Sequence, residues 1–169
     1  KAGVLVTPRH ILIAAHYEYS VGTKVYFVSQ DGSNTVYERT VVSKIRHPEY
    51  SPYFPDVTVC ALDSDLPSDK IKPVKILSSS YVNHLVEYSA GKLPCLALDQ
   101  NEHGLVAEID SIVRDGRITF KHPTGSPRLE FKKNIIVGDS GNPIFMILDL
   151  GDGPELVLLS LWTFGGAGS

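Results

Sequence analysis

Short runs rich in Val, Ile, Leu, Phe and Tyr dominate the chain, and long runs with a 3.6-residue apolar period are absent. Runs of this composition are typical of strands, and the clusters of Gly, Asp, Asn, Ser and Pro between the runs are typical of turns. Many short strands separated by turns predict an all-β sandwich or barrel. The runs expected to be strands are GVLVT, HILIAA, KVYFVSQ, TVYERTVVSKI, DVTVCAL, HLVEYSA, PCLALDQ, LVAEIDSIV, RITFK, NIIVG, PIFMILDL and ELVLLSLW.

The pattern also predicts a hairpin, a short helical turn and a boundary between two lobes. ILDLGDGPELVLL has the Gly-Asp-Gly expected of a hairpin loop. The best candidate for a helix is AAHYEYS, with one or two turns at most. Residues 64–82 are rich in Ser, Asp, Pro and Lys and are expected to connect the lobes. We therefore expect an N-terminal β lobe over residues 1–72 and a C-terminal β lobe over residues 73–169.

Composition narrows the class of protein. The chain has 169 residues, of which 43% are hydrophobic and 21% charged, and its net charge is −3. These values predict a soluble globular chain, and without a basic stripe no nucleic-acid partner is expected. The apolar run from Leu156 to Trp162 contains a serine and is too short to cross a bilayer, so no membrane partner is expected.

The two cysteines allow at most one disulfide, and both Cys60 and Cys95 lie in apolar strand-like runs. We expect buried, unreactive thiols, because a catalytic cysteine needs an exposed electropositive setting. The sequence has no C-x-x-C or H-x-x-x-H spacing, so no metal site is predicted. The acidic segments LDSDLPSD and LDLGDG are interpreted as solvated turns, with calcium in a surface loop as the alternative.

Three separate segments carry the residue types needed for acyl transfer. His16 follows the strand-like run HILIAA, Asp56 opens DVTVCAL, and Ser140 lies between two glycines in VGDSGNP. A serine hydroxyl is a weak nucleophile and needs a base, and an imidazole titrates near neutral pH. A carboxylate on the other ring nitrogen fixes the imidazole tautomer and stabilises the imidazolium. Glycine at position 138 lets the backbone turn so that the N–H groups of Gly138 and Ser140 converge as an oxyanion hole.

The same segments resemble the three signature blocks of trypsin-like (chymotrypsin-fold) serine proteases. GVLVTPRHILIAAHY is similar to the histidine block, IRHPEYSPYFPDVTVCALDSDLP to the aspartate block, and VGDSGNPIF to the nucleophile loop Gly-Asp-Ser-Gly-Gly-Pro. The resemblance implies two six-stranded antiparallel β-barrels, incomplete at the N- and C-termini. It also implies a serine endopeptidase that acts on a peptide or protein substrate, uses no cofactor, and is secreted or periplasmic. The oligomeric state stays open.

The resemblance assigns a role to each candidate residue. His16 would be the general base and acid, Asp56 its orienting partner, and Ser140 the nucleophile. Gly138 and Ser140 would form the oxyanion hole. Substrate would be bound by Asn134, at the floor of the primary specificity pocket, and by the strand segment Thr163, Phe164 and Gly165.

Details around this site refine the expectation. The uncharged Asn134 argues against selection of Lys or Arg. Lys132 and Lys133 leave open either a preference for acidic residues or a solvated, irrelevant pair. Asn142 stands where the family has a second glycine, which requires a backbone without strongly positive φ or an Asn that accepts the left-handed region. Asp139 is expected to pair with an amine or with local backbone.

Two other functions fit the same residues. The first is a catalytically inactive binding or scaffold protein that keeps the fold, although an intact trio of His, Asp and Ser argues against it. The second is an esterase or another acyl hydrolase that uses the same trio.

Overall fold

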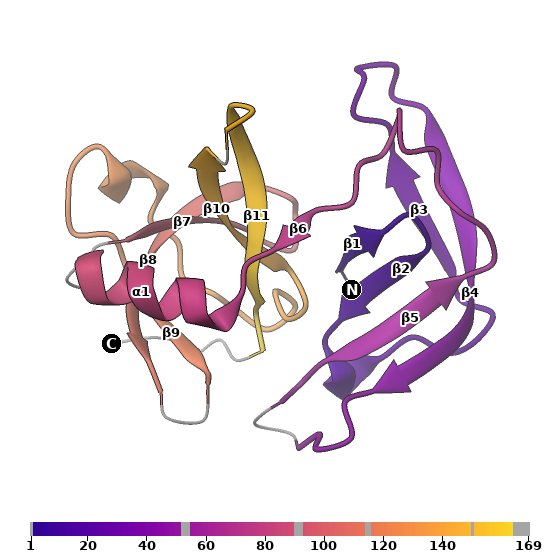
Figure 1. Ribbon diagram of the computed structural model, residues 1–169, viewed down its shortest axis with the longest axis horizontal. Coiled ribbons are helices and arrows are strands. Elements are labelled where there is room, and N and C mark those ends of the chain that lie inside the picture. The colour runs from indigo at the N-terminus through magenta and orange to yellow at the C-terminus, as the bar shows by residue number, and fades with distance from the viewer. Residues whose placement is uncertain (1, 52–54, 90–92, 114–115, 150, 164–169) are drawn as a thin grey trace. The chain divides into compact units, whose positions relative to one another are not determined.

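The computed structural model describes the chain except for residues 1, 52–54, 90–92, 114–115, 150 and 164–169. The fold is mostly β and divides between Val74 and Lys75 into two compact units (Figure 1). Each unit contains one sheet built on its own hydrophobic core.

The first unit is a five-stranded antiparallel half-barrel. Its strands lie in the order β1-β2-β5-β4-β3, which places the second strand directly beside the fifth. A register shift in the pairing of β4 with β5 falls between Val41 and Ser43, and irregularities of this kind bend a sheet. The strands are β1 (Gly3–Thr7), β2 (His10–Ile13), β3 (Lys24–Val28), β4 (Val36–Arg46) and β5 (Thr58–Leu62).

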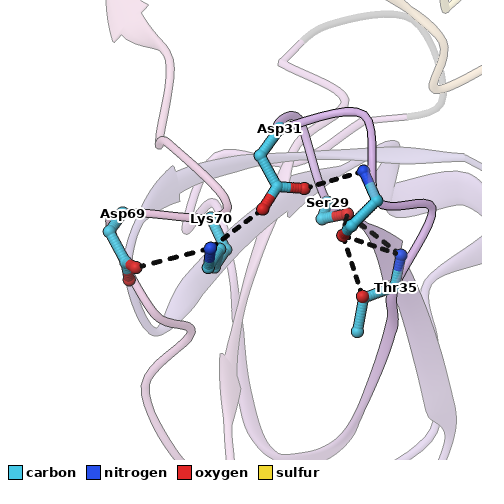
Figure 2. A network of polar contacts seen from close by, with 6 residues as sticks. Ser29, Asp31, Thr35, Asp69 and Lys70 are labelled. Atoms are coloured by element: carbon cyan, nitrogen blue, oxygen red, sulfur yellow. Dashed lines mark hydrogen bonds and ion pairs between the residues drawn. The ribbon is translucent and has the colours of Figure 1, made fainter.

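A polar network closes the loop between β3 and β4 (Figure 2). The Ser33 hydroxyl lies 2.8 Å from the hydroxyls of both Ser29 and Thr35, and the Thr35 N–H donates to Ser29 Oγ at 3.0 Å. Asp31 accepts from the Ser33 N–H at 3.0 Å and from Lys70 Nζ at 2.9 Å. The Lys70 ammonium lowers the pKa of Asp31. Because this ion pair is exposed, it adds little stability, and the hydroxyl network sets the shape of the loop.

The second unit is a six-stranded open sheet with the order β6-β11-β10-β7-β8-β9. The short strand β6 pairs parallel to β11, and the other neighbours are antiparallel. The helix α1 (Ser79–Ser89) follows β6, and a 3-10 turn spans Arg128–Phe131. The strands are β6 (Lys75–Ile76), β7 (Pro94–Leu98), β8 (Gly104–Ile112), β9 (Ile118–Lys121), β10 (Pro143–Asp149) and β11 (Pro154–Leu161).

The core of the second unit gathers side chains from β7, β8 and β10. Alternate positions of β7 and β8 point inward, as the period of a strand requires. Leu85 and Val86 of α1 and the ring of Phe120 pack against this cluster. Its buried members are Cys95, Ala97, Leu105, Ile109, Ile144, Met146 and Trp162.

Several expectations are confirmed. The fold is β-rich, and β10 and β11 form the hairpin predicted from ILDLGDGPELVLL. The helical candidate AAHYEYS forms a single 3-10 turn, Ala15–Tyr17. Cys60 and Cys95 are free and buried. Burial raises the pKa of the Cys60 thiol and raises that of Cys95 to about 12, which makes both thiols unreactive near neutral pH.

Other expectations need correction. The described residues form a half-barrel of five strands and an open mixed sheet of six, in place of two six-stranded antiparallel barrels. Residues 84–89 of the run HLVEYSA lie in α1, because Val82, Leu85 and Val86 have the i, i+3, i+4 spacing of one helical face. NIIVG is not a strand. Val137 is 96% exposed, and the segment leads into the loop that contains Ser140.

No helix among the described residues is long and apolar enough to cross a membrane.

Two isoleucines on β10 test the orientation of that strand. Ile144 is completely buried in the core, whereas Ile147 is 62% exposed. We expect Ile144→Ala to lower the free energy of unfolding by about 2–5 kcal/mol, since it removes buried methyl groups and leaves a cavity. Ile147→Ala should cost less than about 1 kcal/mol. Urea unfolding measures both losses of free energy. Equal losses would contradict the placement of Ile144 on the core face and Ile147 on the exposed face of β10.

Candidate active site

The pairing of β2 with β5 explains why His16 and Asp56 meet. Ile13, at the end of β2, is paired with Thr58, at the start of β5. His16 follows β2 by a few residues and Asp56 precedes β5, so both lie at the same end of these two strands. Ala15 is buried, and the 3-10 turn it begins carries His16 back toward Asp56.

Asp56 holds His16 at two points. The backbone N–H of His16 donates to Asp56 Oδ1 at 2.8 Å, and Nδ1 of the ring lies 2.5 Å from Asp56 Oδ2. The carboxylate is fully buried, while the imidazole is 31% exposed. Because an ionised carboxylate only accepts, Nδ1 carries the proton and Nε2 is the basic nitrogen. This is the tautomer that a general base needs.

A second link joins the same two segments. Oε1 of Glu18 lies 2.9 Å from Lys44 Nζ and 2.6 Å from Arg46 Nη2. The hydroxyl of buried Thr58 donates to the other carboxylate oxygen of Glu18 at 3.4 Å. The hydrogen bond from Lys44, followed by that from Arg46, lowers the pKa of Glu18 against the opposing effect of desolvation. The chain just after His16 is thereby fastened to β4 and to the start of β5.

In the second unit, Ser140 lies on a tight loop organised by the residue before it. Asp139 is completely buried. Its carboxylate accepts the backbone N–H of Gln100 at 2.7 Å and that of Ile136 at 2.8 Å. The Ile136 contact confirms the second of the two expectations for Asp139, bonding to local backbone. Gly141 N–H donates to Trp162 O at 2.7 Å and fastens the other side of the loop to the end of β11.

Gly138 has a conformation that favours glycine. Its φ is +108°, and a Cβ at this position would overlap the side-chain amide oxygen of Gln100. Gly138 is exposed, and among the hydrogen bonds of the described residues none is donated by its N–H. That N–H therefore meets one requirement for an oxyanion donor.

Asn142 fits without backbone strain. The described non-glycine residues with positive φ are Asn34 and Glu102, so Asn142 avoids the left-handed region. It is buried, its side-chain Nδ2 donates to Leu98 O at 3.2 Å, and its carbonyl accepts Trp162 N–H at 3.0 Å. The Asn142 side chain thus ties the loop to β7.

The remaining predicted residues are placed as follows. Asn134 is exposed on the coil before the loop, and Thr163 is half-buried just beyond β11. Phe164 and Gly165 lie outside the described residues. The structure brings His16 and Asp56 together in the first unit. The second unit contains the other described candidates, Ser140, Gly138, Asn134 and Thr163.

Sequence reasoning missed three contacts of buried acids in the second unit. Asp99 is 2% exposed and binds Lys133, so Lys133 already has a partner for its charge. Glu108 is 1% exposed and binds Arg128 Nη1 at 3.1 Å. Gln100 supplies the N–H that Asp139 accepts. An acid inside the strand-like runs PCLALDQ and LVAEIDSIV was the available signal, since a buried charge requires a partner.

No cluster of three or more His, Cys, Asp or Glu side chains that could hold a metal ion occurs in the described part of the chain.

No protein-family model matches the chain, and a search of the curated proteins gives no significant match.

The conformation of Gly138 gives a test of the loop. Gly138→Ala should lower the free energy of unfolding of this unit by about 1–3 kcal/mol, because the new Cβ meets Gln100 and the residue keeps a positive φ. Gly125→Ala is the control, since open space surrounds that glycine and its φ is not in the left-handed range. Thermal and urea unfolding measure the difference. Equal stability of the two variants would show that the loop is built differently.

Proposed function

We propose that the protein is a serine endopeptidase of the trypsin-like type in which His16, Asp56 and Ser140 form the catalytic triad. The observation that carries the proposal is the buried Asp56 carboxylate, which holds both the backbone and the ring of His16. The loop of Ser140 gives further support, with the positive φ of Gly138 and with the buried Asp139 between the two expected oxyanion donors. The proposal requires the Ser140 hydroxyl to come within hydrogen-bond distance of His16 Nε2.

The chemistry follows from these roles. Nε2 of His16 takes the hydroxyl proton while Ser140 Oγ attacks the peptide carbonyl carbon. Asp56 stabilises the imidazolium that forms. The N–H groups of Gly138 and Ser140 bind the oxyanion of the tetrahedral intermediate, and one such donor is typically worth about 10²–10³-fold in rate.

The intermediate collapses when His16 returns the proton to the leaving amine, which breaks the C–N bond and leaves an acyl group on Ser140. Water then attacks the ester, with His16 again accepting a proton. Proton transfer back to Ser140 Oγ releases the carboxylic acid and restores the enzyme. All proton transfers use groups of this chain and water, so the proposed cycle needs no cofactor.

The substrate is an extended peptide segment of a protein. Backbone pairing with Thr163, Phe164 and Gly165 would add the substrate as a strand. Asn134 at the floor of the specificity pocket offers an amide and no charge, so the residue before the cleaved bond is not selected as Lys or Arg. A secreted or periplasmic location belongs to the same proposal.

Covalent labelling tests the nucleophile directly. The full chain should react with a fluorophosphonate probe at Ser140, and Ser140→Ala should abolish labelling. Ser160→Ala is the matched control, because Ser160 is a half-buried serine of β11 in the same unit. Intact-mass and peptide mass spectrometry give the stoichiometry and the modified residue.

A folded chain that stays unlabelled would favour the binding or scaffold alternative and contradict the peptidase. Labelling combined with turnover of ester substrates but not of peptide libraries would instead favour the esterase alternative. Cleavage of the peptide library supports the endopeptidase and defines its specificity.

The role of Asp56 has its own test. Asp56→Asn keeps the shape of the side chain but removes its charge and favours the wrong imidazole tautomer. We expect the turnover number to fall about 10⁴-fold, as in other Ser-His-Asp hydrolases. Asp63→Asn is the control: this exposed carboxylate accepts the Thr40 N–H at 3.2 Å and has no proposed role in the chemistry. Equal activity of Asp56→Asn and the parent chain would remove Asp56 from the mechanism.

A further inference from the structure

The segment between β9 and β10 has little regular structure of its own. Across residues 122–142 the only regular element is the 3-10 turn Arg128–Phe131, and every residue of this stretch is described. Yet it holds the expected pocket floor and the nucleophile loop. Its position must therefore be set by contacts with other elements.

One of these contacts is the carboxylate of Asp99, just after β7. Its Oδ1 accepts the N–H of Asn101 at 2.8 Å and that of His103 at 2.9 Å. Its Oδ2 accepts from Lys133 Nζ and lies 3.5 Å from His103 Nδ1. Asp99 is 2% exposed, so one buried side chain both closes the β7–β8 turn and anchors the segment before the nucleophile.

The next residue makes a second connection between the same two regions. The N–H of Gln100 donates to Asp139 Oδ1 at 2.7 Å, and the Gln100 side chain lies against Gly138. Adjacent residues of the turn thus bind both ends of residues 133–139. A displacement of the turn would move two groups at once: the Asp99 carboxylate that accepts from Lys133, and the Gln100 N–H that donates to Asp139.

We propose that Asp99 and Lys133 are positioning residues for the nucleophile loop. Their ion pair holds the β7–β8 turn in the place from which Gln100 fixes Asp139, and through it Ser140 and the N–H of Gly138. Loss of Lys133 leaves a buried carboxylate without its ammonium partner, and relief of that penalty requires the turn to open toward water. Misplacement of reacting groups by about 1 Å costs on the order of 10²-fold in rate.

This inference rests on the proposed serine hydrolase, because its main readout is acylation of Ser140. Lys133→Met removes the ammonium. Asp99→Asn keeps an oxygen acceptor for the turn amides but removes the charge that pairs with Lys133. Lys133→Arg keeps a cation and should restore the contact. Lys132→Met changes the exposed neighbouring lysine.

A further control separates positioning from general stability. Arg128 pairs with the buried carboxylate of Glu108 at 3.1 Å, so Arg128→Met also leaves a buried acid without this cation. Arg128 and Glu108 make none of the contacts to Gln100 or Asp139 described above. If Lys133 acted only through stability, Arg128→Met would have the same effect on acylation.

The experiment measures the maximal rate of fluorophosphonate acylation and the apparent probe affinity separately, well below each variant's melting temperature. Lys133→Met and Asp99→Asn should lower the maximal rate about 10–100-fold and leave probe affinity within about threefold. Lys133→Arg, Lys132→Met and Arg128→Met should keep the maximal rate within about threefold of the parent.

The positioning role is overturned if folded Lys133→Met acylates at the parent rate, or if Arg128→Met slows acylation as much as Lys133→Met does. Should Asp99→Asn fail to fold, the comparison of Lys133→Met with Lys133→Arg decides, and equal rates overturn the role.

Hydrogen exchange of the Gln100 and Ile136 amides, which donate to Asp139, separates this inference from the proposed function. Both amides should exchange at least tenfold faster in Lys133→Met than in Lys132→Met. If the parent chain is not labelled at Ser140 but this exchange difference is found, the hydrolase fails while the positioning contact stands. Unchanged exchange overturns the contact itself.

Discussion

A carboxylate that is removed from water must find hydrogen-bond donors inside the protein, and this requirement shapes both units. Among the described residues four acids are almost completely buried, and each is met by donors from a distant part of the chain or from a neighbouring loop. Because an unpaired buried charge costs so much free energy, these contacts fix the conformation of the loops that supply the donors. The four acids are Asp56, Asp99, Glu108 and Asp139.

The exposed ion pairs contribute much less to stability than the buried ones. Lys24 and Glu38 approach to 2.7 Å on the surface of β3 and β4, yet both side chains remain largely in water, and such pairs contribute about 0–1 kcal/mol. Removal of one partner from a buried pair costs about 3–5 kcal/mol. The acids that contact the candidate site are therefore buried ones: Asp56 binds the turn of His16, Asp139 holds the loop of Ser140, and Asp99 binds Lys133 in the segment before that loop.

The sequence allowed the strands and part of the site to be predicted, because these depend on local patterns. Apolar runs located β10 and β11, and the glycines between them located their turn. His16 and Asp56 lie directly beside strands, so their meeting follows once β2 and β5 pair. The run HLVEYSA was too short for its period to separate helix from strand. The contact of Asp139 with Gln100 could not be predicted, since any residue offers a backbone N–H and 39 positions separate the two.

The two thiols have a consequence for the conditions in which the protein can work. Cys60 lies in the core of the first unit and Cys95 in that of the second, each surrounded by side chains of its own unit. The sequence contains no other cysteine, so neither sheet can acquire an internal disulfide. The folding of each unit consequently draws on packing, hydrogen bonds and ion pairs, with no disulfide inside either unit. Its stability should be indifferent to whether the surroundings are oxidising or reducing.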